Sequence, residues 1–249
     1  MTLYEWPRAA AFGRVIPKNK IYEHAGANTA LKAIFVREVD QIVWSYKLAP
    51  ETVNLAASKH VTEIQIFRIT ARTEKLDQGV LGAIDKAISF PLIFEVVNGR
   101  RIRLAAAYKR PSEADSSRWV VGEYFHGDWV QEGEQLAAIP IALDMHMLYE
   151  RLLEPLVAGE MAQLVASVGG TFKPFDSCTN PEKKVSLEDR IAQAMAIKKQ
   201  AHHVEGIRSR LAREKQFNKR VAINAELRLA RQELQHLTAE QPTAAIMKY

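Results

Sequence analysis

The C-terminal part of the chain strongly restricts the fold, because residues 186–238 contain no proline and a single glycine, Gly206. Proline and glycine are the residues that most often interrupt helices, so this segment predicts a long helix or a helical hairpin. Ser186 and Asp189 have the spacing of a capping box and indicate where the helix begins. The sequence is compatible with one helix and with a hairpin.

Polar residues interrupt the heptad pattern of this arm. Its two heptad tracks are Val204, Leu211, Asn218 and Ala225, and Ile207, Glu214, Val221 and Arg228. A stable coiled coil needs apolar residues at most of these positions. We therefore expect a coiled-coil-like arm that packs on the body or on a partner helix rather than one that dimerises alone.

The arm also carries the positive charge of the chain. Residues 183–233 contain 13 Lys and Arg against 6 Asp and Glu, a net charge of +7. The whole chain has a net charge of +5, which leaves −2 for the remainder. Such an asymmetry indicates that the arm faces nucleic acid or an acidic protein surface, although a well-solvated helix has the same composition.

Helical and strand patterns alternate through the preceding residues. The expected helices are residues 28–40, 76–88 and 142–156, and the expected strands are residues 41–48, 61–70, 91–97, 100–109, 118–125 and 127–133. Asn28 is the expected cap of the first helix, and Pro155 is expected to break the third. In the third helix Leu143, Met147, Leu148 and Leu152 are expected to face the core.

Two hairpins are expected within this body. Asn98 and Gly99 predict a type I′ turn, and residues 118–125 and 127–133 are expected to pair with each other around His126 and Gly127. The order of elements predicts an α+β (mixed α/β) globular domain with a largely antiparallel sheet, followed by the helical arm.

These patterns predict four regions: a body at residues 1–176, a linker at 177–185, the basic arm at 186–238 and a tail at 239–249. The lone Cys178 falls in the linker and predicts an ordinary thiol rather than a disulfide or zinc site. The longest apolar runs, such as residues 136–143, fall short of the roughly 20 residues that span a bilayer. The N-terminus lacks the layout of a secretory signal, so a cytoplasmic protein without membrane contact is expected.

Specific catalytic motifs are missing from the sequence. It contains neither GxGxxG nor GxxxxGK[ST], which makes nucleotide hydrolysis an unfavourable interpretation, and it has no GxSxG elbow for a serine nucleophile. The adjacent His202 and His203 would point about 100 degrees apart on a helix and do not form a chelate. No catalytic residue, resident metal or cofactor is predicted from motifs.

One polar cluster leaves a nuclease interpretation open. Glu63 and Gln65 lie two apart on one face of an expected strand, and Asp40 opens the preceding strand. Nucleases of the PD-(D/E)xK type use an acid followed by Glu-x-Lys to hold Mg²⁺. Here Gln65 occupies the lysine position, and Lys47 or Lys109 would have to assist at phosphate. A structural hydrogen bond is the simpler interpretation of such a pair.

Basic residues of the arm are candidates for phosphate contacts. These residues are Lys198, Arg208, Arg210, Arg213, Lys215, Lys219 and Arg220. A basic helical stripe typically contacts DNA or RNA backbones in a salt-dependent way. Leu211, Phe217 and Val221 are apolar within this run, and we expect them to anchor a protein partner.

Several strings, read together, resemble a bacterial family catalogued as domain of unknown function 4391. The strings are IPKNKIYE, IVWSYKLAPETVNL, EIQIFRI, AIDKAISFPLIFEV, AYKR, LYERLLEPL and EKQFNKRVAINAELR, which run from about residue 16 to residue 234. The resemblance marks as family-typical Trp44, Tyr46, Lys47, Glu63, Gln65, Lys109, Phe217 and Asn218. It implies a subunit that acts with DNA-processing enzymes, because members are often encoded beside a DNA methyltransferase and a helicase of restriction or anti-phage systems, and it carries over no catalytic residue.

Three functions therefore remain open. The first is an accessory, non-catalytic subunit of a bacterial restriction-type or anti-phage assembly, which docks a methyltransferase or helicase through its arm and touches nucleic acid. The second is a divergent PD-(D/E)xK nuclease that requires Mg²⁺. The third is a standalone DNA- or RNA-binding protein. The sequence does not specify the oligomeric state.

Overall fold

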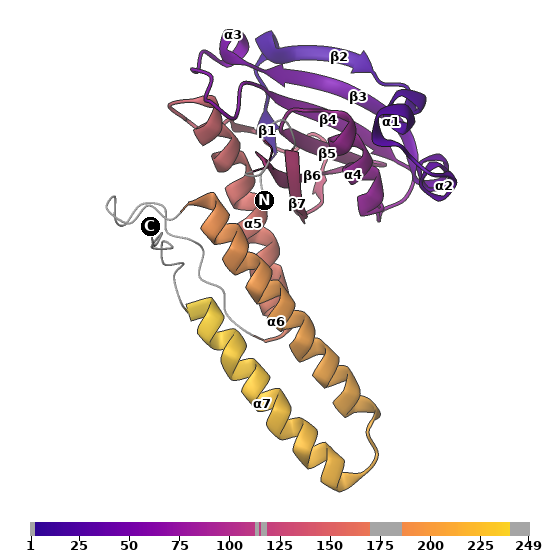
Figure 1. Ribbon diagram of the computed structural model, residues 1–249, viewed down its shortest axis with the longest axis vertical. Coiled ribbons are helices and arrows are strands. Elements are labelled where there is room, and N and C mark those ends of the chain that lie inside the picture. The colour runs from indigo at the N-terminus through magenta and orange to yellow at the C-terminus, as the bar shows by residue number, and fades with distance from the viewer. Residues whose placement is uncertain (1–2, 113–114, 116–118, 170–185, 240–249) are drawn as a thin grey trace. The chain divides into compact units, whose positions relative to one another are not determined.

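The computed structural model describes residues 3–112, 115, 119–169 and 186–239. The chain forms two compact units that divide between Leu156 and Val157, inside a long helix (Figure 1). The first unit is a mixed α/β domain, as predicted, and the second is the helical arm. The predicted linker, with Cys178, lies outside the described residues, and so does the predicted tail after Ala239.

Seven strands form the main sheet of the first unit. They are β2 (Ala11–Val15), β3 (Val39–Leu48), β4 (Ile64–Ala71), β5 (Leu92–Asn98), β6 (Arg101–Pro111), β7 (Trp119–His126) and β8 (Val130–Gln131). The order is β2-β3-β4-β5-β6-β7, with β8 beside β6. The pairs are antiparallel except β4 with β5, which are parallel and joined by helix α4 (Gln78–Ala87). A parallel pair requires such a crossover connection. All the other pairs are antiparallel, which confirms the predicted, largely antiparallel sheet.

Three helices cover one face of this sheet. They are α1 (Lys18–Ala25), α2 (Thr29–Glu38) and α4, which Figure 1 shows gathered on the same side of the strands. Their buried Ile21, Phe35 and Ile84 belong to one hydrophobic cluster with Phe67 and Phe94 of the central strands. Alternate residues of each strand therefore face these helices.

Part of the opposite face of the sheet is also apolar. Ile66 and Ile93, which alternate with the residues just named, are less than 1% exposed. Tyr149, from helix α5 (Met145–Ser167), stacks on Tyr108 of β6 at a centroid distance of 5.9 Å. A short parallel ladder of β1 (Tyr4–Glu5) and β9 (Ala137–Ala138) also belongs to this unit. The apolar residues of β4 are therefore buried on both faces of the sheet, and Ile64, Ile66, Phe67 and Ile69 are each at most 1% exposed.

Local capping signals correctly predicted helix α2, the first of the helices expected from the sequence. The side chain of Asn28 accepts a hydrogen bond from the backbone amide of Leu31 at 2.9 Å, and α2 begins at the next residue. A short 3₁₀ turn (Arg8–Ala10) and helix α3 (Pro50–Val53) complete the helical elements of the described part of the first unit. No helix among the described residues is long and apolar enough to cross a membrane.

Of the two predicted hairpins, the first has a different turn in the structure and the second does not form. The β5–β6 turn consists of Gly99 and Arg100, since Asn98 pairs with Arg101, and Gly99 alone has a positive φ of 61°. Glycine at the first central position fits a type II′ rather than a type I′ turn. Strands β7 and β8 do not pair with each other, because both pair with β6 along its length. The predicted second hairpin was therefore wrong.

The prediction that Pro155 breaks the third helix was also wrong, because α5 continues through it to Ser167. Leu153 and Leu156, on either side of this proline, are completely buried. Burial on both sides offsets the roughly 3 kcal/mol cost of an internal proline. Leu143, which was expected in the core, precedes the helix and is 79% exposed.

The second unit is a packed set of helices rather than one long rod. It contains the end of α5, helix α6 (Leu187–Arg213) and helix α7 (Phe217–Ala239), with a break at residues 214–216. Ser186 caps α6 by accepting a hydrogen bond from the Asp189 amide at 3.1 Å, as predicted. The arm is therefore a helical hairpin, which resolves the alternative that the sequence left open (Figure 1).

Candidate functional site

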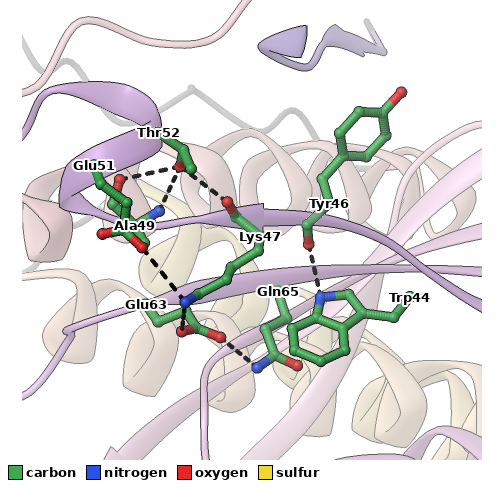
Figure 2. Close-up of polar contacts among 8 residues, drawn as sticks. All are labelled: Trp44, Tyr46, Lys47, Ala49, Glu51, Thr52, Glu63 and Gln65. Atoms are coloured by element: carbon green, nitrogen blue, oxygen red, sulfur yellow. Dashed lines mark hydrogen bonds and ion pairs between the residues drawn. The ribbon is translucent and has the colours of Figure 1, made fainter. Parts of the chain in front are cut away.

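Three predicted polar residues meet where β3 ends and β4 begins (Figure 2). Lys47 lies directly opposite Gln65 in the antiparallel register. The Nζ of Lys47 is 3.1 Å from the Oε2 of Glu63, and Gln65 donates a hydrogen bond from Nε2 to the Oε1 of the same carboxylate at 2.5 Å. Each carboxylate oxygen of Glu63 therefore has its own partner.

Helix α3 holds the end of β3 in place. The hydroxyl of Thr52 donates to the carbonyl of Lys47 at 2.9 Å and accepts from the amide of Ala49 at 2.9 Å. Glu51 lies 3.4 Å from the Nζ of Lys47, but its side chain is 64% exposed, so this ion pair contributes little. The backbone that presents Lys47 is thus fixed by its own loop.

Electrostatics keep Lys47 protonated. The hydrogen bond and the negative charge of Glu63 raise the pKa of Lys47 above its usual value; burial opposes this effect in part, and Glu51 adds to it. A general base needs a pKa lowered toward neutrality. The cluster is therefore suited to hold a charge in place and not to accept a proton.

Asp40, the acid predicted to share a metal with Glu63, lies elsewhere. It begins β3 and forms an ion pair with Arg72 at 2.9 Å, whereas Glu63 lies opposite the end of β3. Eight residues of strand separate the two ends, which is roughly 25 Å. The expected set therefore does not converge, and no group of three His, Cys, Asp or Glu among the described residues could hold a metal ion.

Lys109 does not belong to this cluster, because its side chain is buried against α4. Its Nζ donates to the carbonyl of Asp85 at 2.7 Å, to the carbonyl of Ile88, and lies 3.3 Å from the Oδ1 of Asp85. The side chain is 1% exposed. Three donors thus meet three acceptors, and Lys109 caps the carbonyl end of α4.

Two tyrosines complete this buried network. Tyr124 donates its hydroxyl proton to the Oδ2 of Asp85, while Tyr149 donates to the carbonyl of Ala107 at 2.8 Å and accepts from the amide of Lys109 at 2.9 Å. Burial raises the pKa of Asp85 and lowers the pKa of Lys109, and their mutual attraction only partly offsets the lost hydration. The network is a structural connection between α4, β6, β7 and α5.

The sequence does contain one signal of this network. Asp85 is an acid in the last turn of an amphipathic helix, where the helix dipole disfavours negative charge, and its spacing places it beside the buried Leu81 and Ile84. An acid at such a position indicates a cationic partner. Lys109 could not be identified as that partner because 24 residues separate the two.

A hollow of about 370 Å³ adjoins the Glu63 cluster on the helix-covered face. Trp44 and Gln65 line it from the strands, and Lys20 and His24 line it from α1. The Nε1 of Trp44 donates to the carbonyl of Tyr46 at 3.0 Å, so its ring is fixed. The rest of the lining is mainly apolar, which makes the hollow a gap beside the core.

The basic residues predicted for the arm fall into two groups, and those of the first group form ion pairs with acidic residues. Lys198 is 3.0 Å from Glu160, Arg208 is 3.8 Å from Glu205, and Arg210 forms an ion pair with Glu226. The other four residues, Arg213, Lys215, Lys219 and Arg220, are exposed around the turn between α6 and α7. Charge is therefore concentrated at the end of the hairpin.

Two of the three predicted apolar anchors lie close in sequence to these four basic residues. Phe217 is 78% exposed and Val221 is 54% exposed, and they are one turn apart on α7. Leu211 is half-buried. We use the name tip surface for the six exposed residues Arg213, Lys215, Phe217, Lys219, Arg220 and Val221.

The interior of the hairpin uses other residues. Ala201, Val204 and Ile207 of α6 and Leu227 and Ala230 of α7 are buried. These buried residues pack inside the hairpin, and the tip surface has none of them.

Comparison with known proteins confirms the resemblance seen in the sequence. No curated protein and no solved structure matches the chain. Residues 5–234 match the family described as a domain of unknown function, DUF4391. Since the match extends over both compact units, the chain belongs to the DUF4391 family.

Proposed function

We propose that this chain is a non-catalytic interaction subunit that docks a partner protein through the tip surface of its helical hairpin. The observation that carries the proposal is the pair Phe217 and Val221, exposed one turn apart and surrounded by four cations. The proposed setting is a bacterial restriction-type or anti-phage assembly, with a DNA methyltransferase or helicase as the partner.

Interface chemistry supports a docking role for this surface. Buried aromatic anchors supply most of the energy of protein interfaces, and charged residues work best at the rim, where they stay hydrated and select the partner. Phe217 and Val221 provide an apolar centre, and Arg213, Lys219 and Arg220 provide such a rim. The complementary surface is an apolar groove edged by acidic residues.

The hairpin presents this surface with little freedom to lose on binding. Gln200 of α6 donates to the carbonyl of Ala230 at 3.0 Å, and Gln193 donates to the carbonyl of Leu237 at 3.1 Å. Together with the buried aliphatic residues between the helices, these bonds hold α6 and α7 in register. A preorganised surface pays less ordering entropy when it binds.

The candidate catalytic residues support the non-catalytic part of the proposal. Asp40 lies at the other end of the strand pair from Glu63, and Lys109 is engaged by α4, so the candidate residues do not converge on one point. The genomic neighbourhood implied by the family resemblance supports the choice of partner.

Co-purification of the full-length protein with the products of its neighbouring genes tests the proposal. We expect the double variants Phe217→Ala with Val221→Ala, and Lys219→Glu with Arg220→Glu, to lose the partner. Matched controls on exposed parts of the same helix are Leu229→Ala, and Arg228→Glu with Arg231→Glu. Partner recovery by both tip-surface variants, with unchanged helicity by circular dichroism, would refute the proposal.

A second candidate function is direct binding of DNA or RNA by the same region. It is favoured by the charge of residues 206–225, which contain six Lys and Arg and one acid, Glu214. Contacts to phosphates release counterions, so the logarithm of the binding constant should fall linearly with the logarithm of salt concentration. Replacing Lys219 and Arg220 by glutamate should reduce that slope by about 2. Fluorescence anisotropy with labelled duplexes measures it, and a flat salt dependence would exclude this function.

A further inference from the structure

A second and larger hollow, of about 680 Å³, lies in the first unit on the sheet face turned away from α1, α2 and α4. Its floor is formed by Tyr46, Arg68 and Glu95 on three adjacent strands, which alternate with residues of the helix-covered face. The N-terminal segment with Trp6 and the loop with Glu132 form its walls. Its volume is in the range of small-molecule pockets. We call it the sheet hollow.

Three aromatic rings stand side by side along the sheet hollow. The centroids of Tyr4 and Trp6 are 5.7 Å apart, and those of Trp6 and Tyr46 are 6.2 Å apart. Figure 2 shows Tyr46 pointing away from Trp44 and Gln65, to the other side of β3. Tyr4 and Trp6 are 8% and 6% exposed, and Tyr46 is half-buried, so the part of each ring that is not packed borders the hollow. Aromatic rings beside an open volume can attract a cation.

The lining is acidic although the chain as a whole is basic. Glu5, Glu95, Glu132 and Glu134 contribute four negative charges, and Arg8 and Arg68 contribute two positive charges. The net charge of the sheet hollow is therefore −2, against +5 for the whole chain. A concave surface with such a field raises the local concentration of cations.

Glu95 is a buried acid at the floor of the sheet hollow. It lies on a central strand, is 6% exposed, and accepts a hydrogen bond from the Nε1 of Trp6 at 2.7 Å and one from the Nε of Arg68 at 3.2 Å. Arg68 is also 3.4 Å from Glu132. A carboxylate has about four acceptor sites, so Glu95 retains capacity for a further donor.

The bond from Trp6 also orients the indole. It keeps the ring in the wall of the sheet hollow, and tryptophan is the aromatic residue that binds cations most strongly. A buried carboxylate that fixes an aromatic ring beside an open volume is a preorganised site.

We propose that the sheet hollow binds a small organic cation, whose guanidinium or ammonium head lies against Trp6 and Tyr46 within reach of Glu95. This site is independent of the tip surface and of the proposed docking function. An anionic ligand such as a nucleotide is disfavoured, because its phosphates would meet Glu132 and Glu134 at the wall.

Isothermal titration calorimetry of the full-length protein tests this site. The probes are agmatine, which carries a guanidinium and an ammonium group, spermidine, which carries ammonium groups only, and AMP as an anionic aromatic ligand. We expect saturable binding of at least one cation, and the stronger of the two identifies the preferred head group. Tighter binding of AMP than of either cation, or no cation binding at millimolar concentration, would overturn the proposal.

Substitutions connect such binding to the sheet hollow. Glu95→Gln keeps the size and an acceptor for Trp6 but removes the charge, and Tyr46→Leu removes one ring. Each is expected to weaken binding about tenfold, which corresponds to about 1.4 kcal/mol. Glu132→Gln, at a half-exposed wall position, decides the case if Glu95→Gln does not fold. The control Glu23→Gln removes the same charge from the exposed surface of α1 and should bind as wild type. Wild-type affinity in folded Tyr46→Leu and Glu132→Gln would refute the assignment.

Discussion

Replacement of Lys109 by methionine tests whether the buried network holds α4 against the sheet. Methionine has a similar length and fills the space, so no large cavity forms. However, the carbonyls of Asp85 and Ile88 and the carboxylate of Asp85 all lose their cationic donor. Removal of one partner of a buried ion pair costs about 3–5 kcal/mol. For a slope of about 2 kcal/mol/M in urea, the unfolding midpoint should fall by about 2 M.

Tryptophan fluorescence is a suitable assay for this variant. All four tryptophans of the chain, Trp6, Trp44, Trp119 and Trp129, lie in the first unit, so their signal follows the unit that contains the network. Lys86→Met, on the exposed side of α4, is the matched control and should leave the midpoint unchanged. A loss below about 1 kcal/mol for Lys109→Met, the value of an exposed ion pair, would refute the reasoning.

The pH dependence of the variant gives a second check. Burial already raises the pKa of Asp85, and loss of the ammonium group should raise it further. A carboxyl whose folded pKa exceeds its unfolded pKa contributes stability below the unfolded value, and this is lost as pH rises through the folded value. The deficit of Lys109→Met relative to wild type should therefore be smaller near about pH 4 than near about pH 7. An equal deficit at both would contradict the burial of a charged Asp85.

Three further predictions concern other parts of the chain. Burial by itself raises the pKa of Glu38, but hydrogen bonds from Arg37 and from the Asp77 amide outweigh burial and leave this pKa lowered. Glu38 therefore stabilises the fold at pH values above its unfolded pKa, and this stabilisation is lost as pH falls through its folded pKa. Glu38→Gln should flatten the decline of Tm in acid, and an unchanged profile would contradict this role. Asn28→Ala removes the cap of α2 and should cost about 1 kcal/mol in urea unfolding, whereas no change would show that the cap is dispensable. Ile197→Ala, at a fully buried position of α6, should cost about 2–5 kcal/mol by circular dichroism and leave the tryptophan transition in place; equal shifts of both signals would mean that the two units unfold together.

Local rules were sufficient for much of this structure. The cap at Asn28, the amphipathic pattern of α4, the apolar runs of the central strands and the uninterrupted arm each depend on residues a few positions apart. Such features follow from backbone geometry and side-chain periodicity, which act within one element. The turn at residues 99–100 shows the limit of these rules, since the strand register moved the predicted turn by one position.

Properties that depend on distant residues required the tertiary structure. The antiparallel register separates Asp40 from Glu63, although the two seemed to belong to one motif, and it brings Lys47 opposite Gln65. Packing keeps α5 helical through Pro155, although proline strongly disfavours the interior of a helix.

The amino-acid sequence by itself determined the family, helices α2 and α4, the strands from β3 to β7, the largely antiparallel character of the sheet and the concentration of positive charge in the arm. The tertiary structure alone decided which charges are buried together, as with Asp85 and Lys109, and which remain exposed at the tip surface. It also assembled the sheet hollow from residues that range from Leu3 to Leu136. The physical reason is that hydrogen-bonding patterns and periodicity are local, whereas burial and electrostatic pairing depend on which distant segments the core brings into contact.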